Sequence, residues 1–249
     1  MIRHTWHTKR KHGSRLGTAV MAVVLTIPSV SHALSVQVSD GTNTFTCADG
    51  GTCEAGSPTV DGLLTYSQAV GSWLATVTTG VTKPTIGSSL SPALQLTNVS
   101  VSGNFGSAVP TLTIKLSEQG FTTPNALNSF DFSSTATLNG MTGNVKAYFD
   151  NSNALFGTTS LLGSSPNWQD PNPTDTFAPA FSHNAQVSGN TVQPFSLTLI
   201  AEFSNPAAGV RNSSVTGTLN LVPIPAAVWL FGSALAGMGI IGRRKQVAA

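Results

Sequence analysis

Apolar and polar residues alternate along most of the chain between residues 34 and 221. The clearest run is FSLTLIAEF at 195–203, which has an apolar side chain at every second position from Phe195 to Phe203. Because successive side chains of a strand point to opposite faces, a period of two predicts a strand with one buried face. Such runs predict about nine or ten strands, and the others lie at 35–39, 44–47, 73–77, 94–101, 112–116, 130–132, 145–149 and 215–221.

Turn residues separate these runs and support the assignment to strands. Asp40-Gly41 between the first two runs is a typical hairpin signal. The alternation changes phase at Thr97-Asn98, which predicts a β-bulge. A helical stripe of apolar residues is missing from the same region. Strands with one apolar face must bury that face against a second sheet, so we expect an all-β, antiparallel β-sandwich of the Ig-like or jelly-roll-like kind.

The stretch from Phe149 to Pro194 lacks alternation and is rich in proline, so we expect a long loop there. Trp168 lies near Asp170, Asn172 and Asp175, which together suggest a site where a sugar stacks on the indole ring. In the alternative, Trp168 covers one end of the sandwich and its neighbours form Asx turns. A calcium site is a further possibility, although the spacing and the glycine of a known calcium loop are missing.

The N-terminus has the layout of a secretory signal peptide. The first sixteen residues carry five basic side chains and no acid, and an apolar run follows at 18–30. Pro28 and the small residues Ser31 and Ala33 favour cleavage after Ala33. The sequence therefore predicts a signal peptide at 1–33 and an exported domain at 34–221.

The C-terminus carries a second apolar segment, at 226–242, which contains no charge and is followed by Arg243, Arg244 and Lys245. As a helix it would be about 26 Å long, the short end of what spans a bilayer. Because basic residues stay on the cytoplasmic side, these residues predict a stop-transfer helix with the domain outside the cytoplasm. Pro223 and Pro225 cannot lie inside that helix and predict an extended entry to it.

Charge and cysteine content narrow the function classes. Between the two ends there are four basic and ten acidic residues, a net charge of −6, which argues against a nucleic-acid partner. Cys47 and Cys53 flank a turn-rich loop and predict a disulfide in an oxidising compartment. Two thiolates and His183 are too few ligands for a closed zinc site, so we expect no metal and no cofactor.

The order of Pro-containing box, apolar helix and basic end resembles the PEP-CTERM sorting signal. Val222-Pro223-Ile224-Pro225-Ala226 is similar to the VP-x-P-A variants of that family. The resemblance implies processing near the Pro box by an exosortase at the surface of a Gram-negative cell, and an association with exopolysaccharide and biofilm matrix. Ile224 replaces the glutamate of the name-giving motif, which leaves the exosortase class open. The alternative is a plain membrane anchor at 222–249.

These observations favour a non-enzymatic protein of the cell surface or extracellular matrix, exported and held by its C-terminal helix. The first alternative is a carbohydrate-binding module of the matrix, and the second is a secreted hydrolase. A hydrolase would have to use His183 in Ser182-His183-Asn184, which lacks the context of a known catalytic motif. No pair of acids is distinguished as catalytic carboxylates, so we assign no catalytic residue.

Overall fold

The computed structural model describes residues 34–55, 60–106, 109–123, 129–172, 174–187, 191–204 and 206–222, together with Ala234. The predicted signal peptide and, apart from Val222 and Ala234, the predicted sorting signal lie outside the described residues. The described chain forms thirteen strands: β1 (Ser35–Ser39), β2 (Thr44–Ala48), β3 (Leu63–Val70), β4 (Trp73–Val81), β5 (Ala93–Phe105), β6 (Leu112–Phe121), β7 (Ser129–Thr137), β8 (Thr142–Asp150), β9 (Ser160–Ser164), β10 (Trp168–Gln169), β11 (Ala180–Gln186), β12 (Phe195–Ser204) and β13 (Gly209–Val222).

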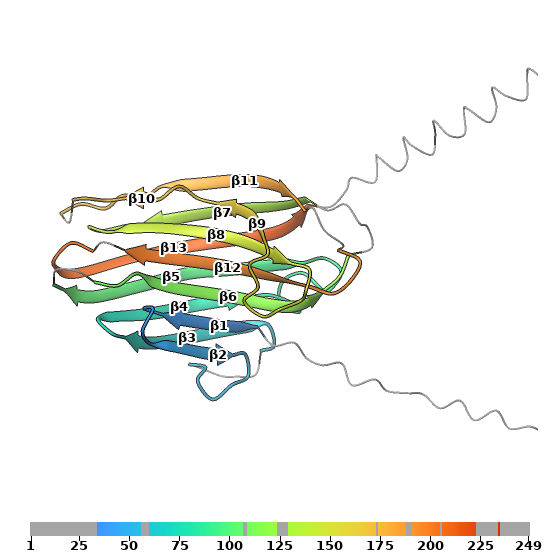
Figure 1. The fold of residues 1–249 in the computed structure, drawn as a ribbon, viewed down its shortest axis with the longest axis horizontal. Coiled ribbons are helices and arrows are strands. Elements are labelled where there is room, and N and C mark those ends of the chain that lie inside the picture. The colour runs from blue at the N-terminus through green and yellow to red at the C-terminus, as the bar shows by residue number, and fades with distance from the viewer. Residues whose placement is uncertain are drawn as a thin grey trace, which may run out of the picture. The chain divides into compact units, whose positions relative to one another are not determined.

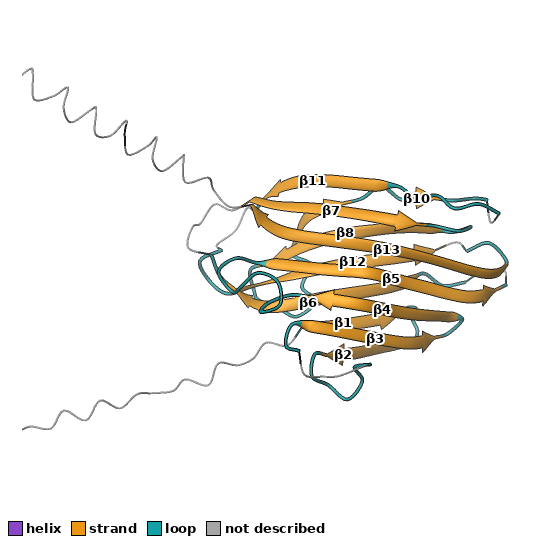
Figure 2. Ribbon diagram, turned by 180° about the vertical axis from the view of Figure 1, so that it is seen from behind, coloured by secondary structure: helices purple, strands orange, loops and turns teal. Residues whose placement is uncertain are grey.

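These strands make two antiparallel sheets that lie face to face (Figures 1 and 2). The first sheet has the order β10-β8-β12-β6-β1-β2, with β9 also paired to β8. The second has the order β11-β7-β13-β5-β4-β3. The predicted all-β class and the antiparallel β-sandwich are confirmed. In each sheet one of the last two strands lies centrally: β12 separates β8 from β6, and β13 separates β7 from β5.

The hydrophobic core lies between the sheets and is built by the predicted alternation. In β12 the inward residues Phe195, Leu197, Leu199, Ala201 and Phe203 are all fully buried. The ring of Phe195 contacts the rings of other strands, with centroid distances of 5.9 Å to Phe121, 6.4 Å to Phe130 and 4.9 Å to Phe149. Burial of each such ring contributes roughly 1.5–3 kcal/mol. The first sheet therefore depends on β12 for hydrogen bonds, and both sheets depend on it for packing.

The predicted hairpin and bulge are both confirmed. The β1–β2 hairpin turns at Asp40-Gly41, where the Asp40 carboxylate accepts hydrogen bonds from the backbone N–H groups of Thr42 and Asn43 at 2.9 and 2.6 Å. In β5 the bulge falls between the Val99–Val215 and Leu96–Gly217 pairs. Asn98 takes the extra position with φ of 47°, a left-handed conformation that asparagine tolerates better than most residues.

The prediction of a long strandless loop between Phe149 and Pro194 is wrong, because β9, β10 and β11 lie in that segment. β9 and β10 both pair with the outer edge of β8, and β11 pairs with β7. Edge strands need only one hydrogen-bonded neighbour and few inward side chains, so their apolar pattern is weak. In β11 Phe181 and Ala185 alone carry that pattern. β3 was also missed, because Gln68 interrupts the apolar series of Leu64, Tyr66 and Val70.

Candidate functional site

Trp168 does not form the exposed sugar platform that the sequence suggested. Its side chain is 6 % exposed and belongs to the hydrophobic core. Asp170 is 5 % exposed, and its carboxylate accepts hydrogen bonds from the N–H groups of Asn172 and Gly140 at 3.0 and 3.1 Å. Asn172 in turn accepts from the N–H and hydroxyl of Thr174. The Trp168 ring is therefore not exposed for stacking, and Asp170 and Asn172 form the Asx turns that the alternative expected.

The same geometry gives no support to a calcium site in this segment. Both carboxylate oxygens of Asp170 are occupied by backbone donors. Asp175 is exposed, and its backbone carbonyl accepts from the Asn139 amide at 3.0 Å. Across the described part of the chain, no three His, Cys, Asp or Glu side chains come together as a metal site would require.

The predicted disulfide is present. Cys47 and Cys53 are joined with an S–S distance of 2.05 Å and a Cα–Cα distance of 5.7 Å. Cys47 is buried at the end of β2. The bridge closes the turn that follows β2, where the Gly51 N–H donates to the Ala48 carbonyl at 2.9 Å. It therefore fixes the end of an edge strand that has a neighbour on one side.

Of the predicted sorting motif Val222, Pro223, Ile224, Pro225 and Ala226, the structure describes Val222 alone, which is the last residue of β13 and pairs with Ser129. The basic cluster at 243–245 lies outside the described residues. None of the helical structure that is described is long and apolar enough to cross a bilayer.

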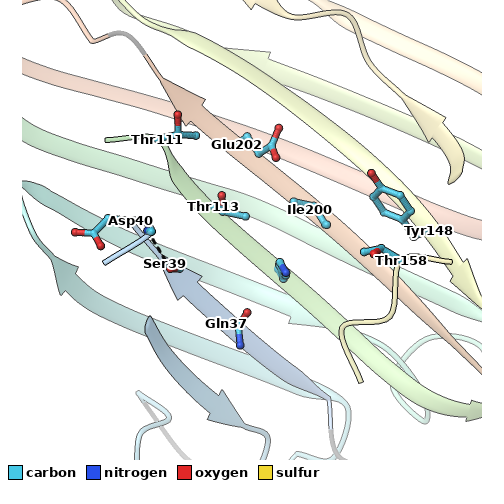
Figure 3. A pocket seen from close by; sticks show the side chains of 11 residues that line it. Gln37, Ser39, Asp40, Thr111, Thr113, Tyr148, Thr158, Ile200 and Glu202 are labelled. Carbon is cyan, nitrogen blue, oxygen red and sulfur yellow. Dashed lines mark hydrogen bonds between the residues drawn. The ribbon is translucent and has the colours of Figure 1, made fainter. Parts of the chain in front are cut away.

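A groove of about 590 Å³ lies on the outer face of the first sheet (Figure 3). Its floor follows one row of paired residues across three strands, in which Gln37 of β1 is opposite Lys115 of β6 and Lys115 is opposite Ile200 of β12. The row continues to Lys146 of β8, which is opposite Ile200 but does not line the groove. Its remaining lining residues are mostly polar: Ser39, Asp40, Gly41, Thr111, Thr113, Tyr148, Thr158 and Glu202.

Ile200 is an apolar residue in a mostly polar lining, yet it is only 6 % exposed. Its neighbours in register on both sides are lysines, Lys115 and Lys146. Lysine side chains bury their methylene stems against apolar groups and keep the ammonium in water. The stems of the two flanking lysines therefore explain the low exposure of the Ile200 side chain. Tyr148 lies diagonally across from Ile200 on β8. The two side chains give the groove an apolar strip beneath a polar rim.

Most charges of the groove are already paired. The Lys146 ammonium lies 2.6 Å from the Glu202 carboxylate, and both side chains are about 30 % exposed. Hydrogen bonds from Asn43 and Thr42 lower the pKa of Asp40, whose carboxylate is thus an occupied cap of the hairpin. Lys115 has neither an ion pair nor a hydrogen bond within the described residues. Its ammonium is therefore available to a ligand.

A second hollow, of about 370 Å³, adjoins the groove and shares Thr111 and Glu202 with it. It continues over β8 and β10 and is lined by further amides and hydroxyls, including those of Asn144, Asn167, Gln169 and Ser204. Asn144 donates to Asn167 at 2.6 Å, while its own Oδ1 is buried and has no partner among the described residues. The two hollows make one polar channel across the first sheet, which we call the outer channel.

A buried ion pair lies on the opposite side of β6. Glu118 is fully buried, and its Oε1 is 2.9 Å from the Lys83 ammonium, which also lies 4.2 Å from the centre of the Phe121 ring. Glu118 Oε2 has no partner among the described residues. Burial raises the pKa of Glu118 to about 7, and the bond to Lys83 opposes that rise without cancelling it.

The histidine considered for a hydrolase does not gain catalytic partners. His183 is exposed on the edge strand β11, where its ring stacks on Phe181 at a centroid distance of 6.3 Å. Within the described residues it has no hydrogen bond to a serine or a carboxylate.

Sequence reasoning missed the outer channel because polar outward positions are expected in any sandwich. The one available signal was the presence of Ile200 and Tyr148 in the polar phase of their strands, at positions that alternation assigns to solvent. An apolar residue in that phase marks a place where the outer face is covered or used.

Comparison with known proteins adds little to this geometry. No family model matches the chain, and no curated protein matches it. Among solved structures, the chain is similar to one from the structure of infectious bursal disease virus Gx strain, with 13 % identity over 84 % of this chain and a TM-score of 0.35. It spans about half of that viral chain, 53 % of its length. A VP2 subviral particle of the same virus gives 11 % identity and a TM-score of 0.23, over 88 % of this chain and 70 % of the viral one.

Proposed function

We propose that the protein is an exported, non-enzymatic protein of the cell surface or extracellular matrix, delivered by a signal peptide and held by a C-terminal sorting signal. The observation that carries the proposal is the position of the Pro box directly after the last strand. β13 ends at Val222, and Pro223 follows without a linker. The Cys47–Cys53 bridge fits an oxidising compartment outside the cytoplasm.

The end of β13 explains why the box stands where it does. Val222 pairs with Ser129, and the Leu221 N–H donates to the Pro92 carbonyl at 2.9 Å. Proline has no N–H for a sheet ladder, so Pro223 and Pro225 end the strand and favour an extended backbone. We expect an exosortase to meet this extended segment between the sandwich and the membrane. The domain is complete before that segment begins, so cleavage there leaves its core intact.

We also assign the sandwich to the jelly-roll-like type rather than the Ig-like type. Successive strands β5, β6, β7 and β8 alternate between the two sheets, and β12 and β13 return to the centre of each. This interleaving is the arrangement of two Greek keys wound together. The pairs β1–β2 and β3–β4 then extend the two sheets at the same side.

The sorting proposal is tested by mass spectrometry of the protein extracted from the surface of a host with an active exosortase. We expect a mature chain that starts at Leu34 and lacks the basic residues 243–245. Replacing Pro223 and Pro225 by alanine should preserve the tail, while truncation after Val222 should give a secreted, folded domain. An intact C-terminus at Ala249 in the wild-type protein would refute sorting and leave a plain membrane anchor.

A further inference from the structure

We propose that the outer channel of the first sheet binds a neutral polysaccharide. The Trp168 ring is buried and takes no part in this site, although its neighbours Asn167 and Gln169 line one end of it. The site is separate from the sorting signal, and it goes beyond the proposed function. Two adjoining hollows that share Thr111 and Glu202 make an elongated site across β1, β6, β12, β8 and β10. An elongated polar channel fits a chain of repeating units better than a single compact metabolite.

The channel offers what a sugar ring requires. The apolar strip of Tyr148 and Ile200 matches the C–H face of a pyranose. Around this strip lie hydroxyl and ammonium groups that have no hydrogen-bond partner among the described residues. They belong to Thr111, Thr113, Lys115, Tyr148 and Thr158. In Figure 3 the Thr113, Ile200 and Tyr148 side chains come from three adjacent strands. Free donors and acceptors beside an apolar surface are the recognition chemistry of a hydroxyl-rich ligand.

Charge decides between a neutral and an acidic polymer. Lys115 is the one cation that lines the two hollows, and Asp40 and Glu202 are the anions. Glu202 is neutralised by Lys146, which lies outside the lining, so Lys115 and Asp40 are left with opposite charges that cancel. The segment between the predicted targeting signals carries −6. A polyanion would therefore gain little from the channel and would be repelled by the rest of the domain. An uncharged polymer avoids that repulsion and can bond to the Lys146–Glu202 pair through its hydroxyls.

Rigid positioning supports binding at this face. Gln37 donates to Thr46 at 3.4 Å, and the Ser39 and Thr44 hydroxyls lie 2.8 Å apart, so both rim residues of β1 are held by β2. The rest of the floor belongs to β6, β12 and β8, which are paired strands of the same sheet. Side chains on paired strands lose little further freedom when a ligand arrives, which lowers the cost of binding.

The test is affinity electrophoresis of the full-length protein in native gels containing dextran, hydroxyethyl cellulose or galactomannan, with alginate as the acidic comparison. A polyoxyethylene detergent is used, because a sugar-headed detergent would compete for the channel. We expect at least one neutral polymer to retard the protein more than alginate does. Tyr148→Ala should weaken that retardation about 3- to 10-fold through loss of the aromatic surface.

Two further variants keep the test decisive. Thr113→Val preserves the shape of the side chain, removes one hydroxyl, and should weaken retardation several-fold. It replaces Tyr148→Ala as the test variant if circular dichroism shows that Tyr148→Ala does not fold. Leu74→Ala is the control, since Leu74 is 45 % exposed on the second sheet, and it should bind as the wild type does. The proposal is overturned if no neutral polymer retards the protein, if alginate retards it most, or if the folded Tyr148 and Thr113 variants bind like wild type. None of these results depends on C-terminal processing, so failure here is separable from failure of the sorting proposal.

Discussion

Replacing Glu118 by glutamine should change how the stability of the protein depends on pH. Glu118 is fully buried, and burial raises its pKa from the ordinary 4.5 to about 7 despite the bond to Lys83. An acid with a raised pKa binds its proton more tightly in the folded state than in the unfolded state. Its contribution to the free energy of unfolding is therefore largest below pH 4.5 and is lost as the pH rises through about 7.

The size of that loss follows from the shift in pKa. The difference between 4.5 and about 7, at 1.36 kcal/mol for each pKa unit, corresponds to about 3 kcal/mol between the two limits. Glutamine does not titrate and removes this slope. It also leaves Lys83 without a carboxylate, but the ammonium keeps the Gln119 carbonyl and the Phe121 ring as partners. We expect a constant cost of about 1 kcal/mol from the weakened hydrogen bond.

The assay is urea unfolding of wild type and Glu118→Gln at several pH values from 4.5 to 8. The wild type should lose about 3 kcal/mol across this range relative to the variant, so that it is the more stable protein at pH 4.5 and the less stable one at pH 8. The two curves should cross on the acidic side of neutral pH. Glu202→Gln is the control, because the Lys146–Glu202 pair is partly exposed and such pairs contribute about 1 kcal/mol or less. Parallel pH profiles of wild type and Glu118→Gln would refute the reasoning.

Four other outcomes are expected. Replacing Cys47 and Cys53 by serine should cost about 2 kcal/mol of unfolding free energy in urea titrations, since the closed loop spans six residues; a loss above 4 kcal/mol would show that the bridge does more than restrict the unfolded chain. Trp168→Ala should cost about 3–5 kcal/mol and lower the melting temperature because the ring is buried; a change below 1 kcal/mol would contradict its place in the core. Below pH 4, where Glu118 is protonated in both states, stability should fall as the pH falls, because hydrogen bonds from Asn43 and Thr42 lower the pKa of Asp40, and because the opposing rise that burial causes in the pKa of Asp150 is outweighed by hydrogen bonds from Ser152 and Thr159; Asp150→Asn should reduce that fall, and an unchanged acid limb would count against it. Changing the basic residues 243–245 to glutamine should expose more of the tail to external protease, and unchanged protection would argue against a stop-transfer segment.

The fold class was predictable because most strands bury one face, and burial imposes a period of two on the sequence. The hairpin at Asp40-Gly41 was predictable because Asp-Gly is a known turn signal. The bulge at Thr97-Asn98 was predictable because the period of two changes phase there. The edge strands β9 to β11 were not, because an edge strand is held by backbone bonds to one neighbour. Their sequences, SLLGS, WQ and AFSHNAQ, carry little alternation.

The site was harder to predict than the fold. Trp168 looked like a surface aromatic because proline and acidic residues surround it, but its ring packs inward while Asp170 turns back to cap a neighbouring loop. The outer channel depends on which strands lie beside one another. That pairing joins Lys115 to Ile200 and Ile200 to Lys146 across gaps of more than fifty residues, and no local pattern encodes it.

In the export that we propose, the central positions of β12 and β13 determine when the two sheets can be completed. A chain threaded outward from its N-terminus would present β5 to β8 before β12 and β13, so the strand that lies between β6 and β8 and the strand that lies between β5 and β7 would be missing until residues 195–222 have crossed. Until then each sheet has a missing middle strand and unpaired edges, a state prone to association with other chains. Completion waits for the very segment that precedes the Pro box. The Pro box would therefore leave the translocation channel only after β12 and β13, the two strands that complete the sheets. Processing at the box would then act on a domain whose strands have all been exported.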